Sequence, residues 1–452
     1  MNTKLVEIAC LLLKSACSFS YIKKFFATPK ATNSVFLKDK DDRIVIYHGV
    51  NVSNFSKGNS SYLPWQTKED FARLKTWGFN LVRYLVFWKA IEPNKGQYNG
   101  TYIQQTIQRI QWLKELGIDV VIDMHQDLYS NKFTGNGFPD WTIKDEGLDF
   151  IQKIPWNINY FEPAVIASYN NFWKSDDLKK SYIEMLEYVI SKFDDFENVI
   201  GIDVMNEPFL GTISSFEKNT LTKFYDNIQE MMIKNNFRME MGFEPMMYTS
   251  GGIPTNLQFL AKRDCFYFPH YYDALCHEGR AYSSFNKFIL KRAMAIKLKE
   301  AQEFNVPLMI GEFGISQKIE NYSEYLKDFV KIANENLIGW TYYTHDYKCF
   351  DDFGILNDDN TPSDILKHIV CVYPQKIAGT NPKILYSDNT FLLTYNMFPG
   401  STEIFIPDLK NVKVLIDNST EVSVTPNSVF IHENKCTNLC STMQSIQITW
   451  DK

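Results

Sequence analysis

Val199-Ile200-Gly201-Ile202-Asp203-Val204-Met205-Asn206-Glu207-Pro208-Phe209 is a strand-like apolar stretch that ends in an acid. A second apolar stretch, Val306 to Ile310, ends in the same way at Gly311-Glu312-Phe313-Gly314. Carboxylic acids that follow buried strands are typical of a TIM barrel, which presents its catalytic groups at the carboxyl ends of its strands. Glu207 and Glu312 are therefore the candidate catalytic residues.

Two carboxyl groups suit the cleavage of a glycosidic bond. The bond breaks through a cation-like sugar, which needs a proton on the leaving oxygen and negative charge on the opposite face. Burial and mutual repulsion separate the pKa values of such a pair, so that one acid stays protonated near neutral pH. Taken alone, Asn206-Glu207-Pro208 is equally well explained as a helix or turn start with a capping Asn. The second acid and the other strand ends decide between these readings.

Further polar side chains follow other strand-like runs. A charged side chain at such a place needs a partner, and a buried His, Tyr or Trp has a structural explanation when taken singly. Their accumulation at strand ends, however, is the pattern of a barrel whose carboxyl-terminal loops carry the site. The residues are Arg83 in the run 79–84, His125 and Asp127 in 119–127, His270 and Tyr272 in 266–272, and Trp340 in 337–343.

Strand and helix signals alternate from about residue 43 to residue 370, which implies a parallel sheet. Apolar residues recur at helical spacing in 61–78 and 102–116, and further helices are predicted at 175–193, 216–235, 283–304 and 320–336. The 452 residues exceed the roughly 250 of a lone barrel. The fold class is therefore α/β, with a (β/α)8 barrel over residues 30–370.

After about residue 375 the pattern changes to short alternating runs separated by Asn, Asp, Pro and Gly. This pattern predicts a small antiparallel β-sandwich over residues 375–452. It would either brace the barrel or contact lipid.

Residues 1–20 combine an early Lys4, an apolar centre from Ile8 to Leu13 and small residues near the end, which together predict a cleaved signal peptide. Lys14 interrupts the pattern. The apolar run is too short to span a bilayer, and we expect a secreted or lumenal protein without a transmembrane segment.

Cysteine and sequon usage agrees with export. Six of the eight cysteines follow the signal segment, and the local pairings are Cys265–Cys276, Cys349–Cys371 and Cys436–Cys440, although six cysteines allow 15 pairings. No cysteine spacing indicates a metal site. Glycosylation sequons lie at Asn51, Asn54, Asn59, Asn99, Asn321 and Asn418, of which Asn51 is expected to be buried.

Charge excludes one class of partner. A net charge of −6 without a basic block argues against nucleic-acid binding. Aromatic residues are dense between Phe133 and Trp173, where most are expected to pack the insertion and a subset to contact sugar or lipid. The segment from Phe209 to Phe243 is a second candidate for a lipid-facing lid.

The residues at these strand ends resemble those of glycoside hydrolase family 5, a family of retaining (β/α)8-barrel enzymes that need no cofactor. By this resemblance Glu207 is the acid/base, Glu312 the nucleophile, and no metal is required. The resemblance also assigns supporting and sugar-binding roles. They fall to Arg83 and Tyr272, which support the nucleophile, to His125, Asn206 and His270, and to Trp340 as a platform for the first sugar.

Within this family the chain is most similar to endoglycoceramidases, which release the intact glycan from glycosphingolipids and leave ceramide. The similarity rests on His48-Gly49-Val50-Asn51, Asp123-Met124-His125-Gln126-Asp127 and the loop Gly135-Asn136-Gly137-Phe138-Pro139-Asp140-Trp141. It implies glycan contacts at Lys57 and Asp127, and a weaker one at Trp173. It also implies gangliosides and lactosylceramide as substrates, with peripheral contact to a membrane or micelle.

Two alternatives remain open at this point. A glucosylceramidase, an endogalactosylceramidase or an endoglucanase of the same family would keep every catalytic residue and differ in its loops. A non-catalytic glycolipid-binding protein is the other alternative, although it has no need for both Glu207 and Glu312. The sequence says nothing about the oligomeric state.

Overall fold

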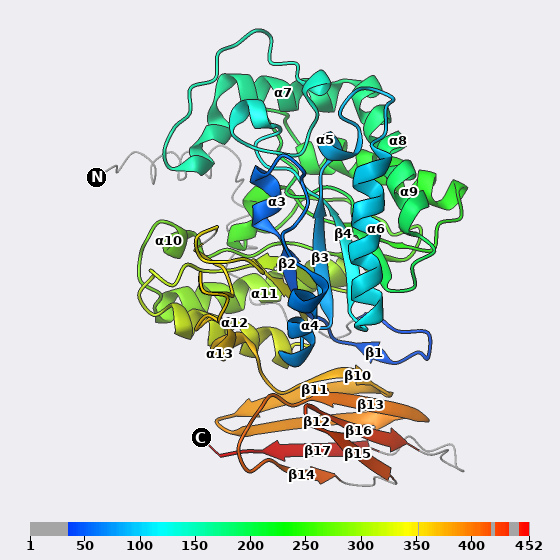
Figure 1. Cartoon of the computed structure of the whole chain (residues 1–452), viewed down its shortest axis with the longest axis vertical. Coiled ribbons are helices and arrows are strands. Elements are labelled where there is room, and N and C mark those ends of the chain that lie inside the picture. The colour runs from blue at the N-terminus through cyan, green and yellow to red at the C-terminus, as the bar shows by residue number, and fades with distance from the viewer. Residues whose placement is uncertain (1–34, 351, 417–420, 434–442, 452) are drawn as a thin grey trace.

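A computed structural model describes residues 35–350, 352–416, 421–433 and 443–451 (Figure 1). The predicted signal segment lies outside these residues, as do Cys436 and Cys440. Within the described ranges, no helix combines the length and apolar character needed to cross a membrane.

The central element is a parallel sheet of eight strands in the order β7-β6-β5-β4-β3-β2-β9-β8. Bridges from Tyr267 to Leu308 and from Tyr271 to Phe313 join its two edges. The predicted barrel is therefore confirmed. Its strands are β2 (His48–Val52), β3 (Leu81–Val86), β4 (Asp119–Met124), β5 (Val199–Asp203), β6 (Glu240–Phe243), β7 (Cys265–Tyr267), β8 (Met309–Phe313) and β9 (Gly339–Tyr342).

Helices cover the outside of the barrel, so all six residues of β3 are buried. Local capping fixes where helices begin: Thr67 and Asp70 form a capping box at α4, and the Ser175 side chain accepts from the backbone of Leu178 at α8. The helices are α3 (Asn54–Gly58), α4 (Lys68–Thr76), α5 (Trp88–Ile91), α6 (Gly100–Glu115), α7 (Pro163–Lys174), α8 (Asp176–Phe193), α9 (Thr222–Lys234), α10 (Ala274–His277), α11 (Ser284–Phe304), α12 (Tyr322–Glu335) and α13 (Leu366–Ile369).

The insertion after β4 holds α7 and several short helical turns. Its aromatic residues mostly pack inward, as expected: Phe138 lies against Trp88, Tyr129 and Phe172. The short turns of the chain are η1 (Asn131–Phe133), η2 (Asp140–Thr142), η3 (Trp156–Phe161), η4 (Phe216–Leu221) and η5 (Met247–Gly251).

The carboxyl-terminal part forms two antiparallel sheets with a shared apolar core, as predicted. One sheet has the order β1-β10-β13-β16-β15 and the other β11-β12-β17-β14. Strand β1, which precedes the barrel in sequence, pairs with β10 through Ile44 and Ile377. The strands are β1 (Ile44–Val45), β10 (Tyr373–Ile377), β11 (Gly379–Ser387), β12 (Thr390–Met397), β13 (Gly400–Phe405), β14 (Lys413–Ile416), β15 (Glu421–Thr425), β16 (Ser428–Glu433) and β17 (Met443–Thr449).

The sandwich packs on the amino-terminal end of the barrel strands, below the barrel in Figure 1. His48, the first residue of β2, stacks on Tyr373 of β10 with ring centroids 3.5 Å apart. On its other side His48 stacks on Trp340 of β9 at 4.2 Å. The sandwich therefore braces the end of the barrel opposite the one where Glu207 and Glu312 follow their strands.

The four described cysteines are free thiols, so the local pairings Cys265–Cys276 and Cys349–Cys371 were wrong. Cys265 begins β7, whereas Cys276 lies in α10 beyond the other end of that strand. Cys371 Sγ instead contacts Nδ2 of Asn334 at 3.3 Å, while Cys349 is exposed. Closeness in sequence does not bring these sulfurs together because a strand or a loop separates the members of each pair.

Candidate active site

Glu312 ends β8 and is held at both carboxylate oxygens. Nη1 of Arg83 donates to Oε1 at 2.6 Å, and the hydroxyl of Tyr272 donates to Oε2 at 2.8 Å. Burial opposes ionisation, but the positive charges of His270 and Arg83 outweigh it and lower the pKa of Glu312 to about 2. Burial and the charge of Glu312 raise the pKa of Tyr272 well above its ordinary value, so its hydroxyl keeps its proton. Glu312 is therefore an oriented, ionised carboxylate.

Arg83 lies on β3 at the centre of a buried set of acids. Its Nη2 atom is 3.0 Å from Asp123, 2.7 Å from Asp203 and 3.1 Å from Glu244. Its side chain is fully excluded from solvent, so these partners supply the counter charge that water does not. Against the effect of burial, they raise the pKa of Arg83 well above its ordinary value. The barrel thus fixes one permanent cation beneath Glu312.

Glu207 follows β5 with a left-handed backbone conformation, φ +41°. A glutamate adopts this conformation only where its surroundings stabilise it. Its carboxylate oxygen Oε1 lies 2.9 Å from Nδ1 of His270 and accepts from the Ser250 hydroxyl at 3.3 Å. One carboxylate oxygen each of Glu207 and Glu312 and one ring nitrogen of His270 all lie within 4.8 Å of one another.

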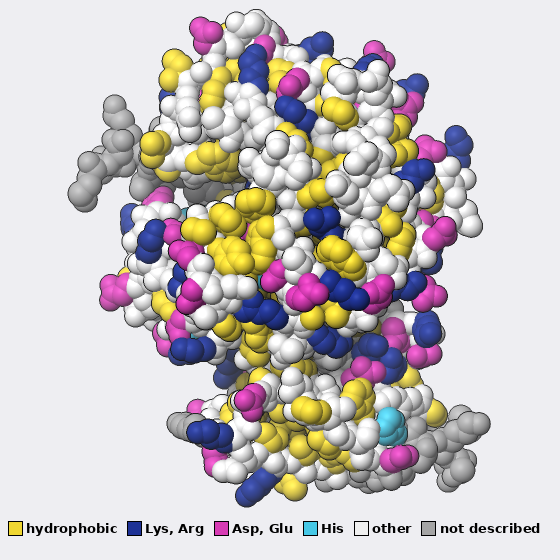
Figure 2. All heavy atoms as spheres, in the orientation of Figure 1, with side chains coloured by type: hydrophobic (Ala, Val, Ile, Leu, Met, Phe, Trp, Pro, Cys, Tyr) yellow, Lys and Arg dark blue, Asp and Glu magenta, His cyan; other side chains and the backbone are white. Residues whose placement is uncertain are grey.

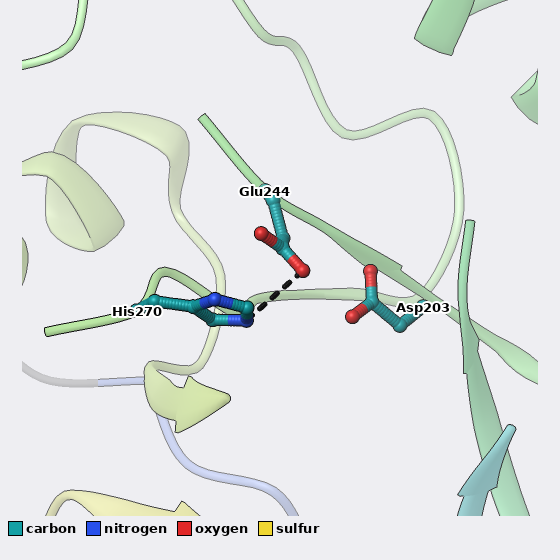
Figure 3. A group of neighbouring side chains, drawn as sticks. All are labelled: Asp203, Glu244 and His270. Atoms are coloured by element: carbon teal, nitrogen blue, oxygen red, sulfur yellow. Dashed lines mark ion pairs between the residues drawn. The ribbon is translucent and has the colours of Figure 1, made fainter. Parts of the chain in front are cut away.

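His270 links these groups. Its Nδ1 atom is 3.6 Å from Oε2 of Glu312, and its Nε2 atom is 3.1 Å from Oε1 of Glu244. Figure 3 shows the imidazole edge facing the Glu244 carboxylate, with Asp203 beyond it. Although burial opposes the charge, Glu244 and Glu312 raise the pKa of His270 well above its ordinary value.

A chain of alternating charges runs from α3 to the centre of the barrel. Lys57 Nζ lies 2.9 Å from Oδ2 of Asp127, the same oxygen lies 3.1 Å from Nε2 of His125, and Nδ1 of His125 lies 2.6 Å from Asp123. Burial opposes ionisation of Asp127, but Lys57 and His125 lower its pKa well below the ordinary value. Nδ2 of Asn136 also donates to Asp127.

Asn206 completes the group. Its Oδ1 atom accepts from Nη2 of Arg83 at 2.8 Å, and its Nδ2 atom donates to the backbone oxygen of Gln126 at 3.0 Å. The structure therefore brings together nine of the eleven residues for which the sequence predicts a site role. They are Lys57, Arg83, His125, Asp127, Asn206, Glu207, His270, Tyr272 and Glu312.

The structure does not bring Trp340 into this group. Its side chain is fully buried between His48 and Phe313, and its Nε1 atom points to Asn334 of α12 at 3.4 Å. Because side chains of a strand alternate between faces, Trp340 points to the helix layer. Trp173 is likewise buried, donating to the backbone oxygen of Phe209 within the insertion packing.

The sequence predicts an aromatic platform at Trp340, but the aromatic residue that lies beside the site is Tyr343. Nζ of Lys57 is 4.8 Å from the centre of the Tyr343 ring, and the Tyr343 hydroxyl donates to Oδ1 of Asn54 at 2.6 Å. The residue follows β9 directly, at the same end of the barrel as Glu312. Tyr343, three residues after Trp340, is therefore the residue of this pair whose ring lies beside Lys57.

Glu244 is a site residue that the sequence reasoning missed. Its position carries a signal, because the strand-like run Met239-Glu240-Met241-Gly242-Phe243 ends in Glu244-Pro245, just as another run ends in Glu207-Pro208. Asp203 ends β5 and Asp123 is the penultimate residue of β4, and both face Arg83. Inward and outward positions of a barrel strand cannot be separated when both faces are buried.

The set Asp203, Glu244 and His270 offers ligand atoms of the kind that bind metal ions. However, Nη2 of Arg83 lies within 3.1 Å of both carboxylates. The guanidinium therefore already fills the cation position between them.

Comparisons with known proteins agree with this geometry. The family model Cellulase (glycosyl hydrolase family 5) matches residues 45–348. The chain is 27% identical over 423 residues to endoglycoceramidase I of Rhodococcus hoagii (strain 103S), covering 85% of this chain and 81% of that protein. It is 24% identical over 399 residues to an endoglycoceramidase of Cyanea nozakii, covering 76% of each. The solved endo-glycoceramidase II from Rhodococcus sp. superposes with a TM-score of 0.83 at 25% identity, over 92% of this chain and 100% of that one. With the family model covering most of the barrel, the chain belongs to glycosyl hydrolase family 5 and is a glycoside hydrolase.

Proposed function

We propose that this protein is a retaining endo-β-glycosidase that hydrolyses the bond between the oligosaccharide and the ceramide of glycosphingolipids. The observation that carries the retaining mechanism is the close approach of the two acids, whose nearest oxygens lie within 4.8 Å. Retaining enzymes place their carboxyl groups about 5–5.5 Å apart, whereas inverting enzymes leave about 6.5–9.5 Å for a water molecule. Similarity to endoglycoceramidases along most of the chain supports the substrate class.

The reaction runs in two steps. Ionised Glu312 attacks the anomeric carbon while Glu207 gives its proton to the departing ceramide oxygen, leaving a glycosyl ester on Glu312. Glu207 then takes a proton from water, whose oxygen attacks the same carbon and releases the sugar with its original β-configuration. Arg83 and Tyr272 hold both oxygens of Glu312 on the line of attack.

The polar chain along one wall of the site supports binding of the glycan. Lys57 and Asp127 are partly exposed, at 19% and 11% of their side chains, and are paired with each other. Such a pair offers both donors and acceptors to sugar hydroxyls. His125 and Asn206, buried behind it, would contact the sugar that is attacked, with the Tyr343 ring beside Lys57 as the stacking surface.

An aromatic wall formed by Phe161, Phe209 and Tyr248 lies near Glu207, which supports a lipid leaving group. Ser250, which contacts Glu207, belongs to η5, and so does Tyr248. The Tyr248 ring packs against Phe209 at 6.0 Å and Phe161 at 6.4 Å, measured between centroids. Since Glu207 protonates the leaving oxygen, the group that departs faces this aromatic wall.

The aromatic wall continues into an exposed apolar segment, residues 148–161, which we name the apolar tip. Figure 2 shows yellow side chains at the upper left, over the segment that precedes α7. Contact of the apolar tip with a membrane or micelle would bring ceramide to the Glu207 side of the site. Its exposed members are Leu148 (41%), Ile151 (65%), Ile154 (91%), Trp156 (42%) and Phe161 (46%).

Export to a secreted or lumenal compartment is also part of the proposal. It rests on the composition of residues 1–20 and on the sequons at Asn54, Asn59, Asn99, Asn321 and Asn418. Asn51 is fully buried and bonded to Arg83, so it is not a glycosylation site in the folded chain.

The function is tested by mass spectrometry of products from a ganglioside, lactosylceramide, glucosylceramide and a galactosylceramide in detergent. We expect intact oligosaccharide plus free ceramide from the purified protein and no product from its Glu312→Gln variant. Glucose from glucosylceramide alone would identify a glucosylceramidase instead. Cleavage by neither protein would overturn the proposal and favour a polysaccharide substrate or a binding role.

A further inference from the structure

Glu244 follows β6 and is buried, with 1% of its surface exposed. Its two carboxylate oxygens have different partners. Oε2 accepts from the backbone N–H of Glu207 at 3.0 Å, while Oε1 lies 3.1 Å from Nε2 of His270 and 3.1 Å from Nη2 of Arg83. The other ring nitrogen of His270 faces the carboxylate of Glu207 at 2.9 Å.

The carboxylate of Glu244 therefore contacts Glu207 in two ways, once directly and once through His270. The direct contact holds its backbone, which is in the left-handed conformation with φ +41°. The contact through His270 orients its side chain, because the ion pair of Nε2 with Glu244 (Figure 3) leaves Nδ1 facing the Glu207 carboxylate.

We propose that Glu244 is a positioning residue for the acid/base Glu207. The inference rests on the function proposed above, since it assigns Glu207 the transfer of a proton to the leaving group. Glu244 itself touches no reacting atom.

The nucleophile side does not depend on Glu244 in the same way. Arg83, which holds Glu312, keeps Asp203 and Asp123 as charge partners and Asn206 and Asn51 as acceptors when Glu244 is altered. The main chain of Glu244 is held separately, because the Tyr225 hydroxyl donates to its carbonyl oxygen at 2.7 Å. A change in the Glu244 side chain therefore reaches Glu312 only through the charge of His270, whereas it reaches Glu207 through both the backbone and the side chain.

Burial and the charge of Asp203 raise the pKa of Glu244 well above its ordinary value, against the opposing charges of His270 and Arg83. The two oxygens of Glu244 accept different hydrogen bonds, one from the Glu207 N–H and one from Arg83. Glutamine at position 244 keeps the shape but replaces one acceptor oxygen by an NH2 group. It cannot accept from the Glu207 N–H and from the His270–Arg83 side at the same time.

The test compares 2,4-dinitrophenyl and phenyl β-lactosides, which differ only in how much the leaving group needs a proton. For Glu244→Gln we expect kcat/KM on the phenyl lactoside to fall about 100-fold, in the range of general acid catalysis, and on the dinitrophenyl lactoside about fivefold or less. Asp123→Asn is the matched control, because it removes a carboxylate from the same guanidinium and, within the described structure, has no hydrogen bond to Glu207 or to Glu244. It should lower both rates by the same factor.

An equal loss on both lactosides in Glu244→Gln would overturn the inference. If that variant does not fold, Glu244→Asp, which keeps a carboxyl group but is one methylene shorter, must give the same selective loss. Because aryl lactosides carry no ceramide, failure of the lipid assay and failure of this test are separate outcomes.

Discussion

Nη1 of Arg83 lies 2.6 Å from Oε1 of Glu312, and the arginine side chain has no access to solvent. The ion pair is part of a larger set, since the same guanidinium also contacts Asp123, Asp203 and Glu244. A planar group with five N–H donors can serve several acceptors at once, which a lysine amine cannot do.

Arg83→Lys should therefore weaken both fold and catalysis. We expect about 2 kcal/mol less unfolding free energy, since hydrogen bonds to charged groups are lost, and a fall in kcat/KM of about 100-fold or more. Urea unfolding and lactosylceramide hydrolysis measure the two effects. Arg73→Lys is the control, because Arg73 bonds Asn360 and lies over the Trp77 ring at the surface, and it should change stability by less than about 0.5 kcal/mol.

Tyr272→Phe removes the hydroxyl that donates to Oε2 of Glu312 while keeping the ring. Loss of one preorganised donor to a reacting carboxylate should lower kcat about 100-fold and leave the melting temperature nearly unchanged. Tyr322→Phe, which removes a hydroxyl bonded to Asp364 outside the site, should keep full activity. Equal activity of the two variants would contradict the role given to Tyr272.

The pH profile on an activated substrate should have no acid limb between pH 4 and 6. His270 and Arg83 lower the pKa of Glu312 to about 2, so the nucleophile stays ionised throughout this range and loses its charge only below it. kcat/KM for 2,4-dinitrophenyl lactoside measures this, because its leaving group needs no acid. An inflection near pH 4.5 in protein that circular dichroism shows to be folded would refute the assignment.

Trp340 and Tyr343 should respond to mutation in opposite ways. Trp340→Phe removes part of the packing between His48 and Phe313 and should cost about 1–3 kcal/mol of stability with KM unchanged. Tyr343→Ala removes the ring beside Lys57 and should raise KM about tenfold or more. Steady-state kinetics with unfolding curves separates the two, and a raised KM for Trp340→Phe would restore it as a sugar contact.

The apolar tip should increase binding of the protein to vesicles but should not affect hydrolysis in detergent micelles. Changing Ile151 and Ile154 together to Ser removes apolar surface that a bilayer would bury, worth about 1–2 kcal/mol per side chain, so vesicle binding should fall at least tenfold. Sedimentation with vesicles and hydrolysis in mixed micelles measure both. Leu385→Ser with Leu415→Ser, which changes two exposed apolar residues on the sandwich, is the control and should bind normally.

The barrel and most of the site could be predicted because each catalytic side chain follows an apolar run. Glu207 and Glu312 end strands in sequence and meet in space since a parallel barrel gathers all its carboxyl ends at one rim. The helices at 175–193, 283–304 and 320–336 agree with α8, α11 and α12 to within a residue or two. Their caps and apolar stripes are local properties of the chain.

The errors arise where the answer depends on direction within an element. Trp340 and Tyr343 are three residues apart and so lie on opposite sides of the backbone, and the sequence does not show which of them lies beside Lys57. The cysteine pairings failed for the same reason, since the sulfur of Cys265 points to Gln229 and that of Cys276 to Asn286. Glu244 follows β6 as Glu207 follows β5, but a strand buried on both faces shows no alternation that would mark the next acid as facing inward.

The pairing of β1 with β10 sets an order of events during synthesis. Ile44 emerges from the ribosome early, whereas its partner Ile377 is made only after every barrel strand. Since domains fold as they are made, β1 remains an unmatched edge while the barrel assembles, and it is matched only when the carboxyl-terminal sheet arrives. A chain that stops after α13 therefore has a barrel with a loose leading strand and an uncovered base. The carboxyl-terminal sheets must therefore be complete before β1 is paired and the amino-terminal end of the barrel is covered.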